Sequence, residues 1–327
     1  MSEKSKFRLE KISIDEKWDA FLNLSPNSTV FGNSNYLKGL DIIVDAYYLL
    51  KGETKKAGFF GVRKNNRNAL IEHPFVIYSG LFFAPFDKEV RLPQIRSDKF
   101  EMAEYVANEI TGIYSEIKFN MHPSVDDLRP FLWVNYNQER GRYNCNLRYT
   151  SELDISSFIT RDNEFEIDGF HQLSSSRKQE VRYSRKKQEI IEVSRDYELL
   201  SNFYTATLKR QGKDVDHKFI QEMMTLVKHI CENGIGEMVV SKTCDGEPGS
   251  VAVFCWDNKR AYYLFGASNP NLRKHHTGTS VLWNSFFDLN KKGINHIDLE
   301  GVNSPYRGWF KLSFGGDMQA YYELSYE

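Results

Sequence analysis

The sequence has no apolar run long enough to cross a membrane. Such a span needs roughly 18 consecutive apolar residues, and no stretch of the printed sequence reaches that length. The amino-terminal stretch MSEKSKFRLEKISIDEKW carries charges throughout and has no apolar core segment. We therefore expect neither a signal peptide nor a transmembrane segment, and we expect the protein to be cytoplasmic.

Cysteine is scarce, which argues against a disulfide framework and against a cysteine-bound zinc site. The four cysteines, Cys145, Cys231, Cys244 and Cys255, show no CxxC spacing and have no paired histidines nearby. A disulfide framework or a zinc site therefore has no support. His275 and His276 are adjacent, and neighbouring histidines rarely point at one ion. The sequence predicts no metal site.

An excess of charge of either sign is also missing. Lys and Arg total 43 against 44 Asp and Glu, a net charge of −1, so any anionic partner must meet a local basic patch. This balance argues against DNA binding. The chain is 41% hydrophobic and 14% aromatic, which is enough apolar surface to offset the entropy lost on folding. We expect a folded, globular protein.

The length of 327 residues favours two domains, because single cores stop growing at about 250–300 residues. The patterns of both halves indicate helices, antiparallel strands, a helix and a strand, in that order. In the second half, these are a basic helix over 174–190, helices over 198–211 and 217–231, strands over 236–243, 249–256 and 260–268, a helix over 277–291, and a strand over 294–301. We predict a duplicated α/β (α+β) unit with mostly antiparallel mixed sheets and domains over 1–155 and 156–327.

Several strings in this order resemble the Fem-type (FemABX) peptidyltransferases and the related double-domain GNAT-like acyltransferases. They are RYTSELDI, SSSRKQEVRYSRKKQ, FYTATLKRQG, AYYLFGASNP, SVLWNSFFDLNKKG, HIDLEG and FKLSFGG, which together cover most of residues 148–316. The first half matches only in element order and in its opening W-x-x-F-L…S-P…F pattern. The long coiled-coil arm of some Fem-type enzymes is absent, since no segment sustains an apolar heptad.

The resemblance implies two tandem GNAT-like folds and an acyltransferase that takes an acceptor, such as a cell-wall precursor, in the cleft between them. Fem-type members use aminoacyl-tRNA as donor, whereas relatives in glycan or lipid pathways are thought to use acyl thioesters of coenzyme A. The implied co-substrate is therefore acyl-CoA or aminoacyl-tRNA, with no tightly bound cofactor. An incomplete coenzyme A turn favours tRNA, and the lack of net positive charge favours a small thioester.

A run of basic residues within 174–190 is a candidate phosphate-binding surface. Its cations are Arg177, Lys178, Arg182, Arg185, Lys186 and Lys187. Helical geometry places Lys178, Arg182 and Lys186 on one face with Arg185 beside them. Phosphates would relieve the repulsion between these charges, and the resemblance points to a nucleotide diphosphate or a tRNA backbone. The alternative is an ordinary solvated helix face.

The turn RKHHTGTS, at 273–280, lies where a GNAT fold binds the pyrophosphate of coenzyme A, just before a helix amino terminus. His275 stands at the Gln/Arg place of the family pattern, Gly278 fits it, and Ser280 replaces the last small residue. We count His275, Thr277, Gly278 and Thr279 as candidate donor-binding residues. The alternative is a capped turn with Thr277 or Thr279 as N-cap.

The string FKLSFGG carries the candidate catalytic cation. We expect the loop 302–308 to lead Phe310 and Lys311 into the cleft, because the matching Phe-Lys pair of Fem-type relatives borders the reaction channel. An ammonium there would stabilise the oxyanion of amine attack on an ester or thioester, and Phe310 would exclude water. The alternative is that Lys311 is an exposed strand residue and Phe310 belongs to the core.

The proton-transfer groups are less clearly marked in the sequence. Asp298 and Glu300 lie two residues apart at a strand end, so either could accept a proton from the amine, although paired acids at strand ends often only solvate a loop. Tyr263 could protonate the leaving group, or it could serve packing alone. All three are counted as candidate catalytic residues.

These features predict an acyl- or aminoacyltransferase that forms an amide on a free amine of a cell-envelope, glycan or related precursor. Its partners would be this small-molecule or precursor acceptor and possibly tRNA, but not DNA. The alternative is a non-catalytic nucleotide- or RNA-binding protein on the same duplicated fold. A structural role has only aromatics such as Phe82, Phe83 and Phe86 as support.

Overall fold

The computed structural model describes residues 6–65, 67–212 and 214–327. Residues 1–5, the start of the stretch that we expect to be neither signal peptide nor anchor, lie outside the described residues. The chain divides into two compact units, Met1–Arg148 with Ala320–Glu327 (unit 1) and Tyr149–Gln319 (unit 2). The sequence suggested a boundary at 155/156 and a contiguous second domain. The units differ from that because the chain returns to unit 1 at its end.

Unit 1 contains a sheet of strands β1-β2-β3-β4 in spatial order, with β5 also paired to β3, all antiparallel. Its elements in chain order are β1 (Arg8–Ile12), α1 (Glu16–Leu24), the 3-10 turn η1 (Val30–Gly32), α2 (Ser34–Leu37), β2 (Ile43–Lys51), β3 (Thr54–Arg63), β4 (Leu70–Ile71), β5 (Gly80–Phe83), α3 (Leu92–Ile113), β6 (Ile117–Asn120) and α4 (Arg129–Leu132). Two further strands, β7 (Tyr143–Asp154) and β13 (Asp317–Tyr326), pass from one unit to the other.

The core of unit 1 forms where α3 covers the sheet. The buried side chains of α3 include Met102, Val106 and Ile110, spaced four residues apart and therefore on one face of the helix. The helix begins at Leu92, and Pro93 occupies its first turn. The end of β13 completes this unit by pairing antiparallel with β6, where Leu324 lies opposite Phe119.

Unit 2 contains the strand order β7-β12-β11-β10-β9-β8, in which only the pairing of β11 with β12 is parallel. Its elements are α5 (Asp168–Gln172), α6 (Ser175–Lys186), β8 (Ile190–Val193), α7 (Tyr197–Arg210), α8 (His217–Glu232), β9 (Gly236–Lys242), β10 (Pro248–Trp256), β11 (Ala261–Ser268), the 3-10 turn η2 (Pro270–His275), α9 (Thr277–Lys291), β12 (His296–Asp298) and α10 (Pro305–Leu312).

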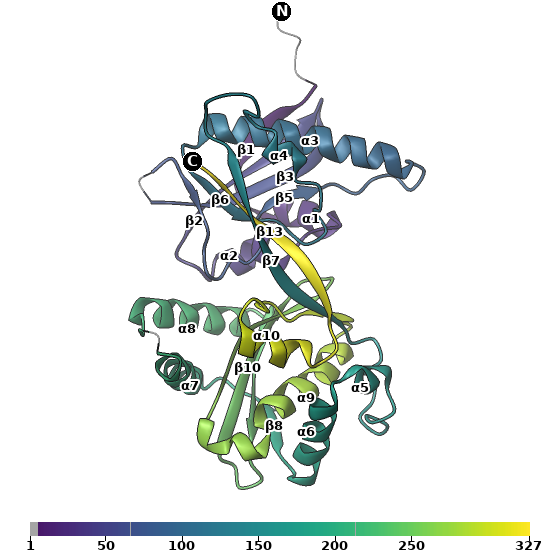
Figure 1. Cartoon of the computed structure of the whole chain (residues 1–327), viewed down its shortest axis with the longest axis vertical. Helices are drawn as coiled ribbons and strands as arrows, with labels where there is room; N and C mark the ends of the chain where they lie inside the picture. The colour runs from purple at the N-terminus through teal and green to yellow at the C-terminus, as the bar shows by residue number, and fades with distance from the viewer. Residues whose placement is uncertain (1–5, 66, 213) are drawn as a thin grey trace, which may run out of the picture. The chain divides into compact units, whose positions relative to one another are not determined.

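The sheet of unit 2 lies between two layers of helices (Figure 1). α9 packs on the face that carries Ala252 and Phe254, and its Leu282 and Phe286 are fully buried there. α7 and α8 cover the other face. Successive side chains of β10 point to opposite faces of the sheet. Because helices cover both faces, this strand is apolar along nearly its whole length. The expected helices and strands of this half are present within a few residues of their predicted bounds, and the mixed, mostly antiparallel α/β architecture is confirmed.

The segment before the candidate lysine differs from our expectation. The sequence indicated a strand over 294–301 and a loop over 302–308, but β12 ends at Asp298 and Pro305–Leu312 forms the helix α10. The basic helix is also shorter than predicted, since α6 ends at Lys186. Phe310 and Lys311 therefore lie on a helix, on neither a loop nor a strand.

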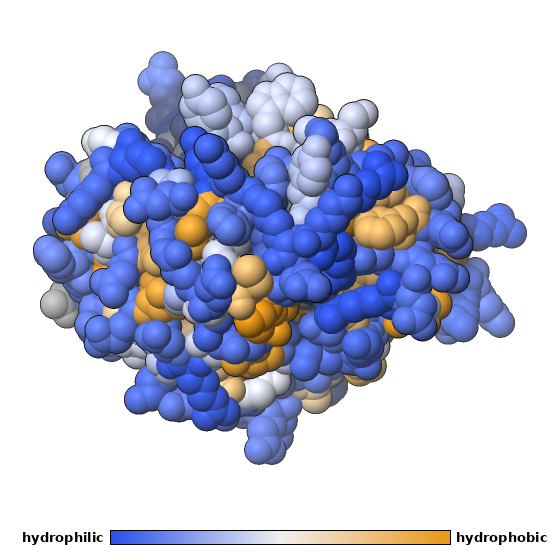
Figure 2. Space-filling view, turned by 90° about the horizontal axis from the view of Figure 1, so that it is seen from below, coloured by the Kyte–Doolittle hydropathy of each residue, from blue (hydrophilic) through white to orange (hydrophobic). Residues whose placement is uncertain are grey.

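No helix of the described residues has the length and apolarity of a membrane span. The face of the molecule in Figure 2 is mostly hydrophilic, with small separate apolar patches. Phe82 and Phe83 are buried and Phe86 is half-buried against the core of unit 1. These three aromatics therefore give no support to a structural role through exposed surface.

Candidate functional site

Helix α10 places Lys311 in the interior of unit 2. Its Nζ donates a hydrogen bond to the backbone oxygen of Glu300 at 2.8 Å and lies 5.0 Å from the ring centroid of Tyr263. Pro305 starts this helix, and Gly308 lets it approach the preceding loop, because a Cβ at Gly308 would lie 2.4 Å from the oxygen of Val302. Burial disfavours the ammonium and lowers the pKa of Lys311 to about 8, although nearby carboxylates oppose this shift.

The carbonyl that accepts the Lys311 hydrogen bond belongs to a sharp turn of two consecutive residues with positive φ. Glu300 has φ of 51° and Gly301 has φ of 44°, so the chain turns sharply after β12 and directs the Glu300 carbonyl at the ammonium. A non-glycine residue with positive φ is uncommon and strained, and such residues gather at functional sites. This turn fixes the position of the candidate cation.

The two acids at the end of β12 are buried behind Lys311. Asp298 accepts hydrogen bonds from the Thr150 hydroxyl and from the backbone N–H of Glu300, the latter at 2.8 Å. Burial, and then the charge of Asp298, raises the pKa of the Glu300 carboxyl well above its usual range. Within the described part of the chain, Glu300 Oε1 has no hydrogen-bond partner.

A cavity of about 310 Å³ opens beside Lys311. The candidates Lys311, Phe310, Tyr263 and Gly278 are among its lining residues. Asp298 and Glu300 are not. Of the candidate catalytic residues, one cation and two aromatic rings therefore line the cavity, and both acids lie outside its lining. Burial raises the pKa of Tyr263, next to which Tyr204 lies. The cavity is large enough for a small-molecule substrate.

Three arginines that sequence reasoning did not select also line this cavity: Arg210, Arg273 and Arg307. All three are exposed, and none forms an ion pair with a carboxylate of the described residues. Arg210 ends α7 and Arg273 lies in η2. In sequence, Arg210 looked like an ordinary helix-end cation, and Arg273 stood at the start of the turn 273–280 without being counted as a candidate. Only the packing of α7, η2 and α10 around one cavity brings them together.

The cations of the basic helix α6 contact neighbouring parts of unit 2. Arg177 is buried, donates to Ser313 Oγ at 3.0 Å and to Glu180 and Thr279, and lies 4.5 Å from the ring centroid of Phe310. Lys178 Nζ donates to the His171 oxygen, Arg182 lies over Phe170, and Lys186 lies over Tyr183. None of these cations lines the cavity.

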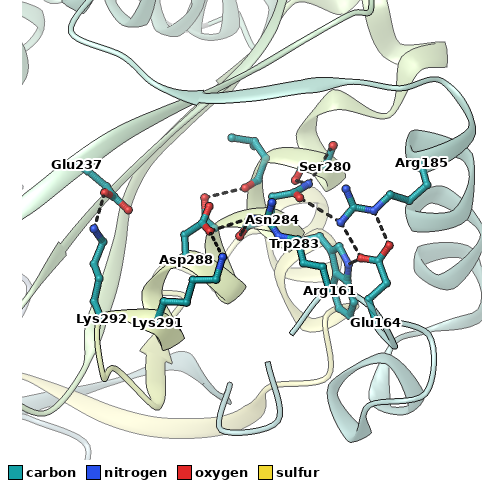
Figure 3. A network of polar contacts seen from close by, with 12 residues as sticks. Arg161, Glu164, Arg185, Glu237, Ser280, Trp283, Asn284, Asp288, Lys291 and Lys292 are labelled. Carbon is teal, nitrogen blue, oxygen red and sulfur yellow. Dashed lines mark hydrogen bonds and ion pairs between the residues drawn. The ribbon is translucent and has the colours of Figure 1, made fainter. Parts of the chain in front are cut away.

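Arg185 belongs to a polar network under α9 (Figure 3). Its guanidinium binds Glu164 Oε2 at 2.7 Å and Asn284 Oδ1 at 3.1 Å, and the indole N–H of Trp283 donates to the same Glu164 oxygen at 2.7 Å. Glu164 is buried, so its charge is compensated within the protein. This network connects the segment before α5 to α6 and α9. Phosphate binding by the α6 cations stays a prediction.

The turn before α9 differs in detail from the expected capped turn. The N-cap is His276, in a left-handed conformation and without a side-chain cap, rather than Thr277 or Thr279. Thr277 is buried against Ser250, with 2.8 Å between their hydroxyl oxygens, and Thr279 contacts Glu180. Of the four candidates here, only Gly278 lines the cavity, and His275 lies outside its lining. In the described ranges, no three His, Cys, Asp or Glu side chains gather as a metal ion would require.

The second unit matches a known family, and the whole chain is similar to solved structures. Residues 172–308 match the family described as acetyltransferase (GNAT) domain. No match was found among curated proteins. Among solved structures, that of FemX is 13% identical, with a TM-score of 0.66 and coverage of 96% of both chains. L-PGS from Bacillus licheniformis is 12% identical, with a TM-score of 0.53 and coverage of 97% of this chain and 93% of that one.

A tandem GNAT protein from the clavulanic acid biosynthesis pathway is 8% identical, with a TM-score of 0.52 and coverage of 98% of both chains. These likenesses extend over nearly the whole chain and confirm the expected resemblance and the tandem fold. We conclude that the chain has a tandem GNAT-like fold and that residues 172–308, in its second unit, match an acetyltransferase (GNAT) domain.

Proposed function

We propose that the protein transfers an acyl or aminoacyl group from an ester or thioester donor to a free amine and forms an amide. The observation that carries this proposal is the cavity of unit 2, in which the Lys311 side chain lies beside Phe310 and Tyr263. A half-buried cation next to an apolar wall is suited to a carbonyl under attack, because negative charge develops on its oxygen.

The reaction proceeds by addition and elimination at the donor carbonyl. The amine nitrogen forms a bond to the carbonyl carbon, and the carbonyl electrons move to the oxygen, where Lys311 donates a hydrogen bond. The intermediate then collapses, the bond to the carrier oxygen or sulfur breaks, and the carrier takes up the proton that the amine loses. Phe310 limits access of water, which would otherwise hydrolyse the donor.

Glu300 holds Lys311 in position in this proposal. Its backbone oxygen accepts the Lys311 hydrogen bond, whereas its buried carboxyl has a strongly raised pKa and does not line the cavity. Proton acceptance by Asp298 or Glu300 and donation by Tyr263 stay predictions.

Arg210, Arg273 and Arg307 would bind the phosphates of the donor carrier or of the acceptor. Aminoacyl-tRNA and acyl-CoA both carry phosphates, so either donor suits these arginines. The acceptor in this proposal is an envelope, glycan or related precursor, and the reaction takes place in the cytoplasm, where both donors are made.

The test is transfer of label by the purified full chain. Radiolabelled alanyl-tRNA, seryl-tRNA and acetyl-CoA are each incubated with a panel of amine-bearing precursors, and amide products are separated and counted. We expect product from one donor class. Donor binding without transfer to any amine would contradict the proposal and favour the non-catalytic binding protein instead.

A further inference from the structure

Unit 1 contains a groove of about 620 Å³ that the proposed reaction does not use. The groove lies between α1, the start of β3, the chain that follows β5, and α3. Its apolar wall includes Phe21 and Met102, which are buried, Phe7 and Phe86, which are half-buried, and Leu24, whose side chain is 68% exposed. Leu24 thus adds exposed apolar surface to the lining of the groove.

Four lysines of α1, β2 and β3 line this groove. Lys17 lies in the first turn of α1, and Lys51, Lys55 and Lys56 come from the ends of β2 and β3 that flank their connecting turn. None of these four lysines forms an ion pair with the carboxylates that the structure describes. The Lys55 ammonium lies 3.9 Å from the ring centroid of Tyr48, whose hydroxyl donates to the Lys17 oxygen.

The acids next to these lysines in sequence are engaged elsewhere. Asp15 caps α1 by accepting from the backbone N–H groups of Lys17 and Trp18, and Asp19 accepts from the backbone N–H of Ser34 at 2.8 Å. Glu53, in the turn between β2 and β3, pairs with Arg8 at 3.1 Å. The two acids that line the groove, Asp87 and Asp98, come from the chain after β5 and from α3.

We propose that this groove binds an amphiphile with an alkyl chain and one anionic head group, the chain covering Phe21, Leu24 and Phe86 and the head meeting the lysines. The size and apolar lining suit a ligand of this class. The four lysines favour an anionic head group, because cations without ion-pair partners interact most favourably with a ligand of opposite charge. A carboxylate and a phosphate would both satisfy this chemistry.

The test is calorimetric titration of the full chain with four ligands that share a twelve-carbon chain, each kept below its critical micelle concentration. They are dodecanoate, dodecyl phosphate, neutral dodecyl maltoside and cationic dodecyltrimethylammonium. We expect the two anions to bind at one site and the other two to bind about tenfold more weakly or not at all. The stronger of the two anions identifies the head group as a carboxylate or a phosphate.

Variants then locate the site. Lys17→Gln with Lys55→Gln should weaken anion binding about tenfold, and Leu24→Asp should abolish it without unfolding the protein, because Leu24 is exposed. The matched control is Lys38→Gln with Lys64→Gln, two lysines of unit 1 outside the groove, which should leave binding unchanged. Equal binding of dodecyl maltoside, or equal loss in the control, would overturn the proposal. The readout is binding alone, so it is independent of transfer activity.

Discussion

At the scale of single residues, the proposed chemistry depends on one lysine held by an uncommon backbone turn. Lys311 is half-buried, its pKa is lowered to about 8 by burial, and its hydrogen bond to the Glu300 oxygen needs positive φ at both Glu300 and Gly301. Strain of this kind persists where the surrounding structure fixes it. Three predictions concern these residues.

Replacing the Lys311 side chain should remove transfer and leave the fold intact. We expect Lys311→Ala to lower kcat about 10²–10³-fold, the usual effect of losing one group that stabilises the oxyanion. Lys218→Ala is the matched control, since Lys218 is an exposed lysine of the same unit, with its side chain 84% exposed. Initial rates with the active donor measure both. A loss of less than about threefold in Lys311→Ala would contradict the role.

The rate should also depend on pH through this group. Its pKa in the folded protein is about 8, so the ammonium is present below that pH and is lost as the pH rises through it. We therefore expect kcat to fall above about pH 8. Lys311→Arg keeps its charge, so whatever activity remains in that variant should lack the decline. A rate that rises through pH 8 would indicate that the neutral amine is the active form.

The Glu300–Gly301 turn can be tested by adding a Cβ. Gly301→Ala places a side chain at φ of 44° and 3.6 Å from Lys311 Nζ, which should cost about 1–2 kcal/mol of stability and move the decline in the pH profile. Gly52→Ala is the control, because Gly52 has φ of 59° with nothing within 4 Å. It should lose similar stability in thermal unfolding and keep the wild-type profile.

At the scale of elements, α6 holds α10 in place through Arg177. This buried guanidinium contacts Ser313, Phe310 and Phe314, which lie in α10 or just after it. The sequence presents Arg177 as one more cation of a basic helix, but burial and these contacts give it a positioning function. The remaining cations of α6 contact other parts of the same unit.

Removing Arg177 should therefore destabilise unit 2 and disorder the cavity wall. We expect Arg177→Ala to lower the free energy of unfolding by about 3 kcal/mol or more, because it removes a buried guanidinium that binds Glu180 and Ser313 and opens space beside Phe310. Arg182→Ala is the control on the same helix, since Arg182 is exposed. Denaturant unfolding gives both values. Equal stability of the two variants would contradict this function of Arg177.

At the scale of the whole molecule, the chain forms two units with separate cores, and its last strand returns to the first unit. Leu324 of β13 is fully buried in the core of unit 1, opposite Phe119 of β6. Residues more than 200 positions apart in the sequence thus complete one sheet. The stability of unit 1 therefore depends on the carboxyl-terminal residues.

A substitution in β13 should consequently weaken unit 1. We expect Leu324→Ala to cost about 2–5 kcal/mol, as for other buried leucines, and to reduce amide protection in β6 and α3 more than in β9 and β10. Ser325→Ala, at the next position of the same strand, should change stability by less than about 0.5 kcal/mol. Hydrogen exchange measures both. Loss of protection confined to unit 2 would contradict this dependence.

The sequence alone determined most of the elements and their order, α10 excepted, because apolar spacing, caps and turn residues act over a few neighbouring positions. Helix α9 and strands β9, β10 and β11 follow from such local patterns, and the motif order led to the tandem fold and to Lys311. Tertiary structure decided that Lys311 lies on a helix, that Arg210, Arg273 and Arg307 share its cavity, and that β13 returns to unit 1. These features depend on contacts between residues far apart in the chain, which local periodicity cannot encode.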